Sequence, residues 1–225
     1  MIITWLGHSC FALESGGYRV VIDPYQGVEG LPDTSTEANA VYCSHQHGDH
    51  AYTQGVRITE KAPSPFSVRE VATCHDDQGG SLRGPNTVRC FTAEGLTVAH
   101  LGDLGHRLTA AQVEAIGPCD ALLLPVGGYY TIDAPTAKAV AEQIRPRVII
   151  PMHYRFGSHG LPVIGTAEDF TALYPPQQVH VYDTSTFSLT PDTAPQVAVL
   201  AYGNNPPLYR TALHWRILEK TPMEG

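Results

Sequence analysis

The residues best suited to chemistry lie in one short stretch, Ser44–His50, directly after an apolar run. At the end of a strand, residues two positions apart point to the same side, so His45 and His47 can both face one metal ion. The glycine that follows lets the chain turn sharply, which would direct Asp49 and His50 toward a second ion. Imidazole nitrogens and a carboxylate, with no thiolate, suit zinc and also manganese or iron.

One loop cannot complete two metal sites, so further ligands must come from elsewhere in the chain. His75, Asp103 and His153 each stand where an apolar run predicted as a strand gives way to a loop. His100 lies close before Asp103 and competes with His75 as the third histidine of the first site. The sequence favours His75 but does not fix the direction of the His100 side chain.

The elements that must position these residues are mostly strands. Apolar alternation and turn signals predict strands over 1–5, 10–14, 18–22, 68–74, 87–93, 96–101, 120–126, 147–150, 179–182, 186–189 and 197–202. Capping signals and helical spacing predict helices over 109–116, 133–144 and 166–174. This order suits two sheets with helices on the outside. We expect one domain over 1–203 and a tail, 204–225, whose role the sequence leaves open.

Composition argues against several classes of protein. With a formal net charge of −8 and no run of Lys or Arg, the 225-residue chain has no general attraction to nucleic acid or anionic membranes. The five cysteines include no Cys-x-x-Cys pair, so neither a disulfide framework nor a thiolate zinc site is indicated. No apolar stretch is long enough to cross a membrane, and we expect a cytoplasmic protein.

The motifs resemble a known superfamily. His45-x-His47-x-Asp49-His50, with Gly102-Asp103 and a histidine after a later strand, is similar to the metallo-β-lactamase-fold metal-dependent hydrolases. Within it, several pieces resemble the branch that contains the ascorbate phosphate lactonase and related uncharacterised hydrolases; they are Trp5–Ser9, Ile22–Pro24, Gly102-Asp103, Leu124–Gly128 and Ile150–His153. The resemblance implies an α+β fold, a four-layer αβ/βα sandwich with the metal site at one edge of the two sheets.

The resemblance also implies roles for the ligand-type residues, with two divalent ions per chain. One site would be formed by His45, His47 and His75, the other by Asp49, His50 and His153, and Asp103 would bridge the ions. Zinc is expected first, with manganese or iron as alternatives.

The catalytic residues would be Asp49, which orients the attacking hydroxide and carries its proton, and Asp103, which holds the ions together. Residues expected to support the ligands or face the substrate are His8, His100, His106, Tyr154 and Arg155. We expect His8 to bond to a metal ligand rather than to bind metal itself. For Asp23, a strand-end turn and support of a ligand remain equal alternatives.

Two adjacent divalent ions can share one water and generate hydroxide near neutral pH. We therefore expect a hydrolase in which bridging hydroxide attacks an ester, lactone or phosphoester of a small, anionic substrate. A nuclease or RNA-processing phosphodiesterase is the first alternative, and the acidic charge argues against it. A di-iron redox or metal-binding sensor protein is the second. The oligomeric state, including a homo-oligomer, stays open.

Overall fold

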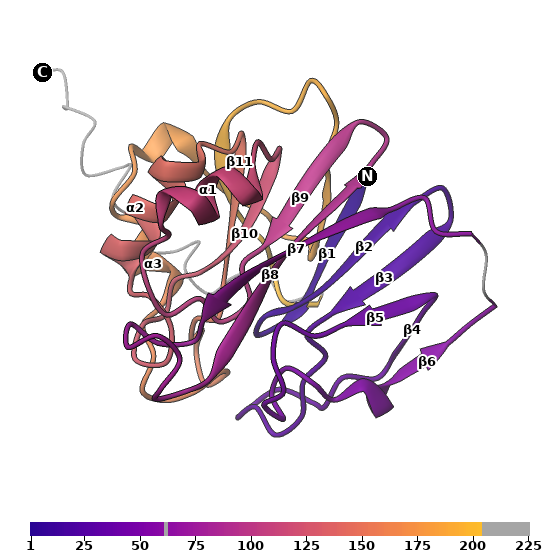
Figure 1. Ribbon diagram of the computed structural model, residues 1–225, viewed down its shortest axis with the longest axis horizontal. Helices are drawn as coiled ribbons and strands as arrows, with labels where there is room; N and C mark the ends of the chain where they lie inside the picture. Colours follow the sequence, from indigo (N-terminus) through magenta and orange to yellow (C-terminus); the bar gives the residue numbers. More distant parts are fainter. Residues whose placement is uncertain (61–62, 204–225) are drawn as a thin grey trace, which may run out of the picture.

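The computed structural model describes residues 1–60 and 63–203, and its centre consists of two sheets that face each other (Figure 1). The five-stranded sheet has the order β13 (Thr186–Ser188), β1 (Ile2–Gly7), β2 (Cys10–Ser15), β3 (Tyr18–Ile22), β5 (Ala40–Tyr42). The seven-stranded sheet has the order β12 (Val179–Val181), β14 (Gln196–Val199), β11 (Val148–Met152), β10 (Ala121–Pro125), β9 (Leu96–His100), β8 (Pro85–Ala93), β7 (Ser67–Cys74). A third sheet pairs β4 (Thr36–Ala38) with β6 (Val56–Ile58).

Strand alternation builds the core between the two large sheets. Along β2, Phe11 and Leu13 join the main hydrophobic cluster, while Cys10 and Ala12 join a smaller cluster on the other face. Because successive side chains point to opposite faces, this pattern fixes the register of β2 against its neighbours. The main cluster also takes in the fully apolar strand β10, which is buried along its whole length.

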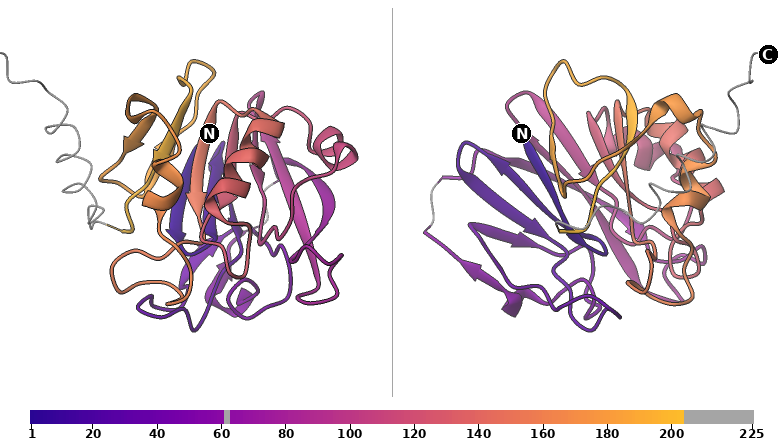
Figure 2. Two further views of the ribbon diagram at one scale, coloured as in Figure 1. Left: turned by 90° about the vertical axis from the view of Figure 1, so that its left-hand side faces the viewer. Right: turned by 180° about the vertical axis from the view of Figure 1, so that it is seen from behind.

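The predicted helices are confirmed, and they pack on the seven-stranded sheet (Figure 2). They are α1 (Ala110–Ile116), α2 (Ala134–Ile144) and α3 (Ala167–Thr171). Thr109 forms the predicted capping box of α1 with Gln112, and Asp133 caps α2 by accepting a hydrogen bond from the backbone N–H of Thr136. The helix α3 ends three residues before the predicted 174, and turns continue the chain to that point.

The outer face of the five-stranded sheet is covered differently from what the sequence predicts. In the described residues it carries the β4–β6 ribbon, the short 3₁₀ helix η1 (Thr53–Gly55) and loops instead of α-helices. The smaller hydrophobic cluster lies under this cover and includes Val21, Ala38 and Val56. The α+β sandwich is confirmed, but its helices lie on one side. Strands of three residues are too short to show an alternation, so no pattern predicts β4 and β6.

Strand direction brings distant parts of the chain to one edge. β1, β3 and β5 run in the same direction, as do β7, β9, β10 and β11 in the other sheet. Their carboxyl ends therefore meet at a shared edge of the sandwich. No helix in the part of the chain described here is long and apolar enough to cross a membrane. The predicted tail, 204–225, lies outside the described residues.

Substitution of Val56 tests whether packing of the β4–β6 ribbon stabilises the sheet beneath it. Val56 is 6% exposed whereas Ile58, on the same short strand, is 47% exposed. Val56→Ala should lower the free energy of unfolding by roughly 1–3 kcal/mol because it leaves a cavity, and Ile58→Ala by less than about 0.5 kcal/mol. Urea denaturation measures both, and equal losses would show that the ribbon does not pack as described.

Candidate metal centre

The ligand-type residues come from five strand ends at the shared edge. His8 follows β1, the loop 44–50 follows β5, His75 follows β7, Asp103 comes shortly after β9, and His153 follows β11. The structure thus brings together residues that span positions 8 to 153 of the chain.

Asp103 lies at the middle of this cluster. Its Oδ2 atom is 3.1 Å from His50 Nε2, 3.3 Å from both His75 Nε2 and His153 Nε2, and 4.0 Å from His45 Nε2. The Asp103 side chain is only 2% exposed. One carboxylate oxygen therefore faces four imidazoles, which is the position a bridging ligand would need.

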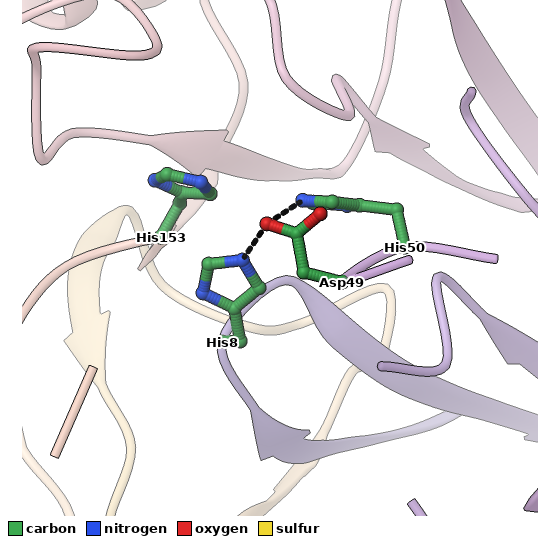
Figure 3. Close-up of side chains that lie close together, drawn as sticks. All are labelled: His8, Asp49, His50 and His153. Atoms are coloured by element: carbon green, nitrogen blue, oxygen red, sulfur yellow. Dashed lines mark ion pairs between the residues drawn. The ribbon is translucent and has the colours of Figure 1, made fainter. Parts of the chain in front are cut away.

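The remaining donors fall into two groups around Asp103. His45, His47 and His75 form one group, and His8, Asp49, His50 and His153 form the other (Figure 3). Within each group the ligand atoms lie within 4.8 Å of one another. The grouping has the composition expected from the sequence, with His8 added to the second group.

The donors fit divalent ions. Among the described residues, several buried polar atoms of the cluster have no hydrogen-bond partner: His8 Nδ1 and Nε2, His45 Nε2, His50 Nε2, His75 Nδ1, Asp103 Oδ1, and His153 Nδ1 and Nε2. A buried polar atom without a partner costs about 1–3 kcal/mol, so such atoms rarely gather without a ligand. Nitrogen and carboxylate oxygen donors with no thiolate suit zinc, manganese or iron.

Burial sets the protonation of the imidazoles. It lowers the pKa of His45 to about 3 and, together with the neighbouring His153, that of His8 to about 4, so both are neutral, the form that binds metal. His50 differs: burial alone would lower its pKa, but Asp103 and Asp23 raise it well above the usual value. A metal ion at His50 Nε2 would therefore displace a proton.

The two carboxylates of the cluster, buried Asp103 and half-buried Asp49, stay ionised. Burial alone would raise the pKa of Asp103, but His153 and His50 hold it well below the usual value. Burial alone would also raise the pKa of Asp49, but the neighbouring His8 and the charge of His50 lower it.

A hydrogen-bond network fixes the tautomers of two histidines. Asp23 Oδ2 lies 3.0 Å from His50 Nδ1 and accepts the Ser44 hydroxyl at 2.6 Å, and Asp23 Oδ1 accepts the Ser44 backbone N–H. Since the hydroxyl hydrogen goes to Asp23, Ser44 Oγ must accept the hydrogen bond from His45 Nδ1, 2.9 Å away. The Nε2 atoms of both histidines are then the ones available to metal, that of His50 after loss of its proton. Of the two alternatives for Asp23, the structure favours support of ligands.

Three residues of the site have backbone conformations that side chains disfavour. His8, Asp23 and His153 have φ of 50°, 51° and 53°, in the left-handed region. Each such residue costs about 1–3 kcal/mol and persists where the surrounding structure requires it. The strain therefore collects at the strand ends that aim side chains into the cluster.

The glycine requirement lies at Gly102, not at Gly48. Gly48 does not have a positive φ, and a Cβ there would meet only an ordinary contact at 3.5 Å. The expected sharp turn is present, closed by a hydrogen bond from His50 N to the His47 carbonyl, but it does not require a glycine. Gly102 has φ +55°, and a Cβ would lie 2.3 Å from Asn86 Oδ1 and 2.4 Å from Ser44 Cβ. This close approach allows Asp103 to reach the centre.

Sequence reasoning missed two supporting residues. Buried Asn86 accepts the Asp103 backbone N–H at 3.0 Å and donates to the Leu101 carbonyl at 2.9 Å, which fixes the turn that carries Asp103. Asp76, next to His75, accepts four backbone N–H groups of residues 78–83. Burial alone would raise the pKa of Asp76, but these hydrogen bonds lower it to about 2. Two features of the sequence could have indicated these residues. Asn86 lies in a strand, where asparagine is uncommon, and Asp76 lies before a glycine pair, where aspartate often accepts backbone hydrogen bonds of a turn.

His100 and His106 do not face the centre. His100 Nδ1 accepts the Gly102 N–H at 3.1 Å, so its Nε2 donates to the Ser9 carbonyl at 2.8 Å. His106 Nε2 accepts the Cys74 N–H at 3.1 Å, beside His75. Both rings are engaged with backbone, and this geometry favours His75 over His100 as a ligand.

The expected substrate-side residues are placed less favourably. Tyr154 is 1% exposed and packs in the core with its ring centroid 5.3 Å from that of Trp5, so it does not line an open entrance. The Nε atom of Arg155 is buried without a hydrogen-bond partner among the described residues. Arg83, which the sequence did not single out, donates to the Tyr129 carbonyl at 3.1 Å and lies 5.6 Å over the ring of Tyr130. This contact joins the loop after β7 to the loop after β10.

The fold and the donor cluster define the class of metallo-β-lactamase-like proteins. Residues 2–153, which contain all the donors, match the family model described as a beta-lactamase superfamily domain, and the chain belongs to this superfamily. The family expected from the sequence is therefore confirmed.

Relatives support the same family. A UPF0173 protein of Pyrococcus furiosus is 31% identical over 184 residues, and a UPF0173 metal-dependent hydrolase of Archaeoglobus fulgidus is 31% identical over 194; each match covers 68% of this chain and 83% of the relative. A solved Thermotoga maritima structure, described as a Zn-dependent hydrolase of the metallo-β-lactamase superfamily, is 37% identical with a TM-score of 0.68, covering 88% of this chain and 97% of that one. An isothiocyanate hydrolase from Delia radicum gut bacteria shares the fold at 12% identity and a TM-score of 0.59, covering 90% and 97%.

Gly102→Ala tests the close approach beside Asp103. The added Cβ must displace Asn86 or Ser44, so the variant should lose metal affinity at least tenfold and be less stable than Gly95→Ala. Gly95 is the matched control because its φ is +72° but a Cβ there meets nothing within 4 Å in the described structure. Its substitution should cost only the left-handed penalty of about 1–2 kcal/mol. Metal titration and urea denaturation compare the two, and matching losses would contradict the crowding.

Ser44→Ala tests the tautomer network. Without the hydroxyl, His45 Nδ1 loses its acceptor, and metal affinity should fall about 10- to 100-fold. Ser15→Ala is the control, because Ser15 is also buried and bonds a carboxylate, that of Glu94. Ser15 lies at the end of β2, whereas the start of this strand is the part next to His8 and the metal centre. Unchanged metal affinity in Ser44→Ala, measured by competition with a chelator, would show that the network does not support the ligands.

Proposed function

We propose that this metal-dependent hydrolase of the metallo-β-lactamase superfamily holds two divalent metal ions and hydrolyses an ester, lactone or phosphoester of a small anionic substrate. The observation that carries the proposal is the position of Asp103, with one oxygen facing imidazoles of both donor groups. A single-ion site would not need two complete sets of donors on either side of a shared carboxylate.

Each group of residues has a role in this proposal. His45, His47 and His75 would hold one ion, Asp49, His50 and His153 the other, and Asp103 would lie between them. When bound, two such ions activate water as a nucleophile near neutral pH and polarise the substrate oxygen. Zinc, manganese and iron all suit the donors.

The two catalytic carboxylates differ in access. The Asp49 side chain is 31% exposed and that of Asp103 is 2% exposed. Asp49 can therefore meet the substrate, orient the attacking water and pass a proton to the leaving group. Asp103 is enclosed by histidines, and its part is to keep the two halves of the site in register.

The charge of the site favours an anionic substrate. Two doubly charged ions carry one charge more than the nearby carboxylates Asp49, Asp103 and Asp23 together, so the site loaded with metal and neutral water keeps positive charge within an acidic protein. The formal net charge of −8 argues against a long nucleic acid as substrate. Human tRNase Z shares the fold at 13% identity with a TM-score of 0.51, and this likeness concerns the fold alone. A small-molecule substrate and a cytoplasmic location, consistent with five free cysteines, remain our predictions.

Metal content and turnover together test the proposed function. The purified protein should take up close to two equivalents of zinc, manganese or iron, and a panel of chromogenic esters, lactones and phosphodiesters should include a substrate. Asp103→Ala should lose both equivalents and all turnover while its circular dichroism stays that of the parent. His180→Gln, which alters an exposed histidine of β12 outside the cluster, is the control and should keep metal and turnover.

Two results would overturn the proposal. One is a protein that takes up no transition metal even on soaking. The other is Asp103→Ala with full metal content and activity. Turnover of single-stranded nucleic acid, but of none of the small substrates, would instead favour the phosphodiesterase alternative.

A further inference from the structure

His8 is a buried histidine whose ring makes no well-formed hydrogen bond. Its side chain is 0% exposed, and in the described part of the chain neither ring nitrogen has a hydrogen-bond partner. The ring centroid lies 4.3 Å from that of His153 and 5.0 Å from that of His50. Such a ring loses its bonds to water without replacement, which costs about 1–3 kcal/mol unless a ligand is bound there.

The hydrogen bond to a metal ligand that the sequence led us to expect is poorly formed. His8 Nε2 lies 3.5 Å from Asp49 Oδ2, beyond the usual 2.7–3.2 Å of a hydrogen bond of this kind (Figure 3). Donor atoms that share one ion at about 2.1 Å are about 3.0–3.4 Å apart in octahedral or tetrahedral geometry. The distance of 3.5 Å, and that of 3.8 Å from the same oxygen to His50 Nε2, are close to this spacing.

The backbone holds His8 in a strained position that aims it at the cluster. Its φ is 50°, and its carbonyl accepts hydrogen bonds from Trp5 Nε1 at 3.0 Å and from His153 N at 3.2 Å. The second bond ties His8 directly to a residue of the second donor group. Strain of this size is retained where the side chain must occupy one place.

We infer that His8 binds directly to the ion held by Asp49, His50 and His153, as an additional protein ligand of the second site. A substrate-contacting role fits less well because His8 is fully buried, whereas the Asp49 side chain is 31% exposed and lies on the accessible side. The inference rests on the proposed two-metal function.

This ligand makes the two sites unequal. The second site has five protein donors, His8, Asp49, His50, His153 and Asp103, whereas the first has His45, His47, His75 and Asp103. A site with five protein donors suits a six-coordinate ion such as manganese or iron better than four-coordinate zinc. We therefore expect the two equivalents to differ in affinity, with the ion of the first site leaving first to a chelator.

The test is His8→Asn, titrated with Co²⁺. Asparagine tolerates the left-handed conformation but is too short to reach the ion, so the backbone is kept while the ligand is removed. One of the two equivalents should bind at least tenfold more weakly, and its visible absorption should become more intense as the coordination number falls. The other equivalent should keep its affinity.

Trp5→Phe is the matched control, because it removes the hydrogen bond to the His8 carbonyl and leaves the imidazole in place. Its Co²⁺ affinities should stay within about threefold of the parent. His8→Asn with parental affinities and spectrum would overturn the inference, as would loss of turnover with unchanged metal binding.

If His8→Asn does not fold, a second measurement still tests the inference. X-ray absorption spectroscopy counts the imidazoles bound to one equivalent of Co²⁺ in a His47→Ala, His75→Ala double variant, whose first site keeps only one histidine. Three imidazoles support the inference, and two overturn it. A parent protein that binds no metal would instead defeat the proposed function itself, so the two failures are distinguishable.

Discussion

The structure depends on one buried carboxylate surrounded by imidazoles. Asp103 brings its Oδ2 within 3.3 Å of nitrogens from three histidines that belong to loops after β5, β7 and β11. A charge this deeply buried is tolerated only when it is paired. Around it, Gly102, Asn86, Ser44 and Asp23 leave little freedom of position. Backbone strain is also retained where it aims a side chain into the centre, at the left-handed residues His8, Asp23 and His153.

The asymmetry of the sandwich follows from where the helices are needed. The seven-stranded sheet has parallel neighbours among β9, β10 and β11, whose connections must cross over its face, and α1 and α2 provide these crossovers. The five-stranded sheet is built mainly from hairpins, and the connection between its parallel neighbours β3 and β5 contains the short strand β4 in place of a helix. A two-stranded ribbon with a small apolar cluster covers the outer face of this sheet.

Much of the fold and of the cluster could be predicted from the sequence. Long alternating or fully apolar runs located the main strands, and the Thr109–Gln112 capping box marked the start of α1 at its observed position. The residues after those strands are the ones the structure gathers, because strand direction decides which loops meet. What escaped prediction depends on contacts between distant residues. The support of Asp103 by Asn86, the orientation of His100 toward Ser9 and the fit of Gly102 against Ser44 leave no periodic signal.

The spread of the donors along the chain, from His8 to His153, has a consequence for folding. No short segment of the described chain contains a complete set, so metal can be held tightly only after both sheets have formed and docked. Contacts between residues this far apart slow folding, because the entropy of closing long loops is lost before the stabilising contacts form. An ion that binds only the finished structure then stabilises it by mass action. Cells short of metal would thus hold a less stable population of this protein, more open to proteolysis, and the rate of metal exchange would report how often the sheet edge opens.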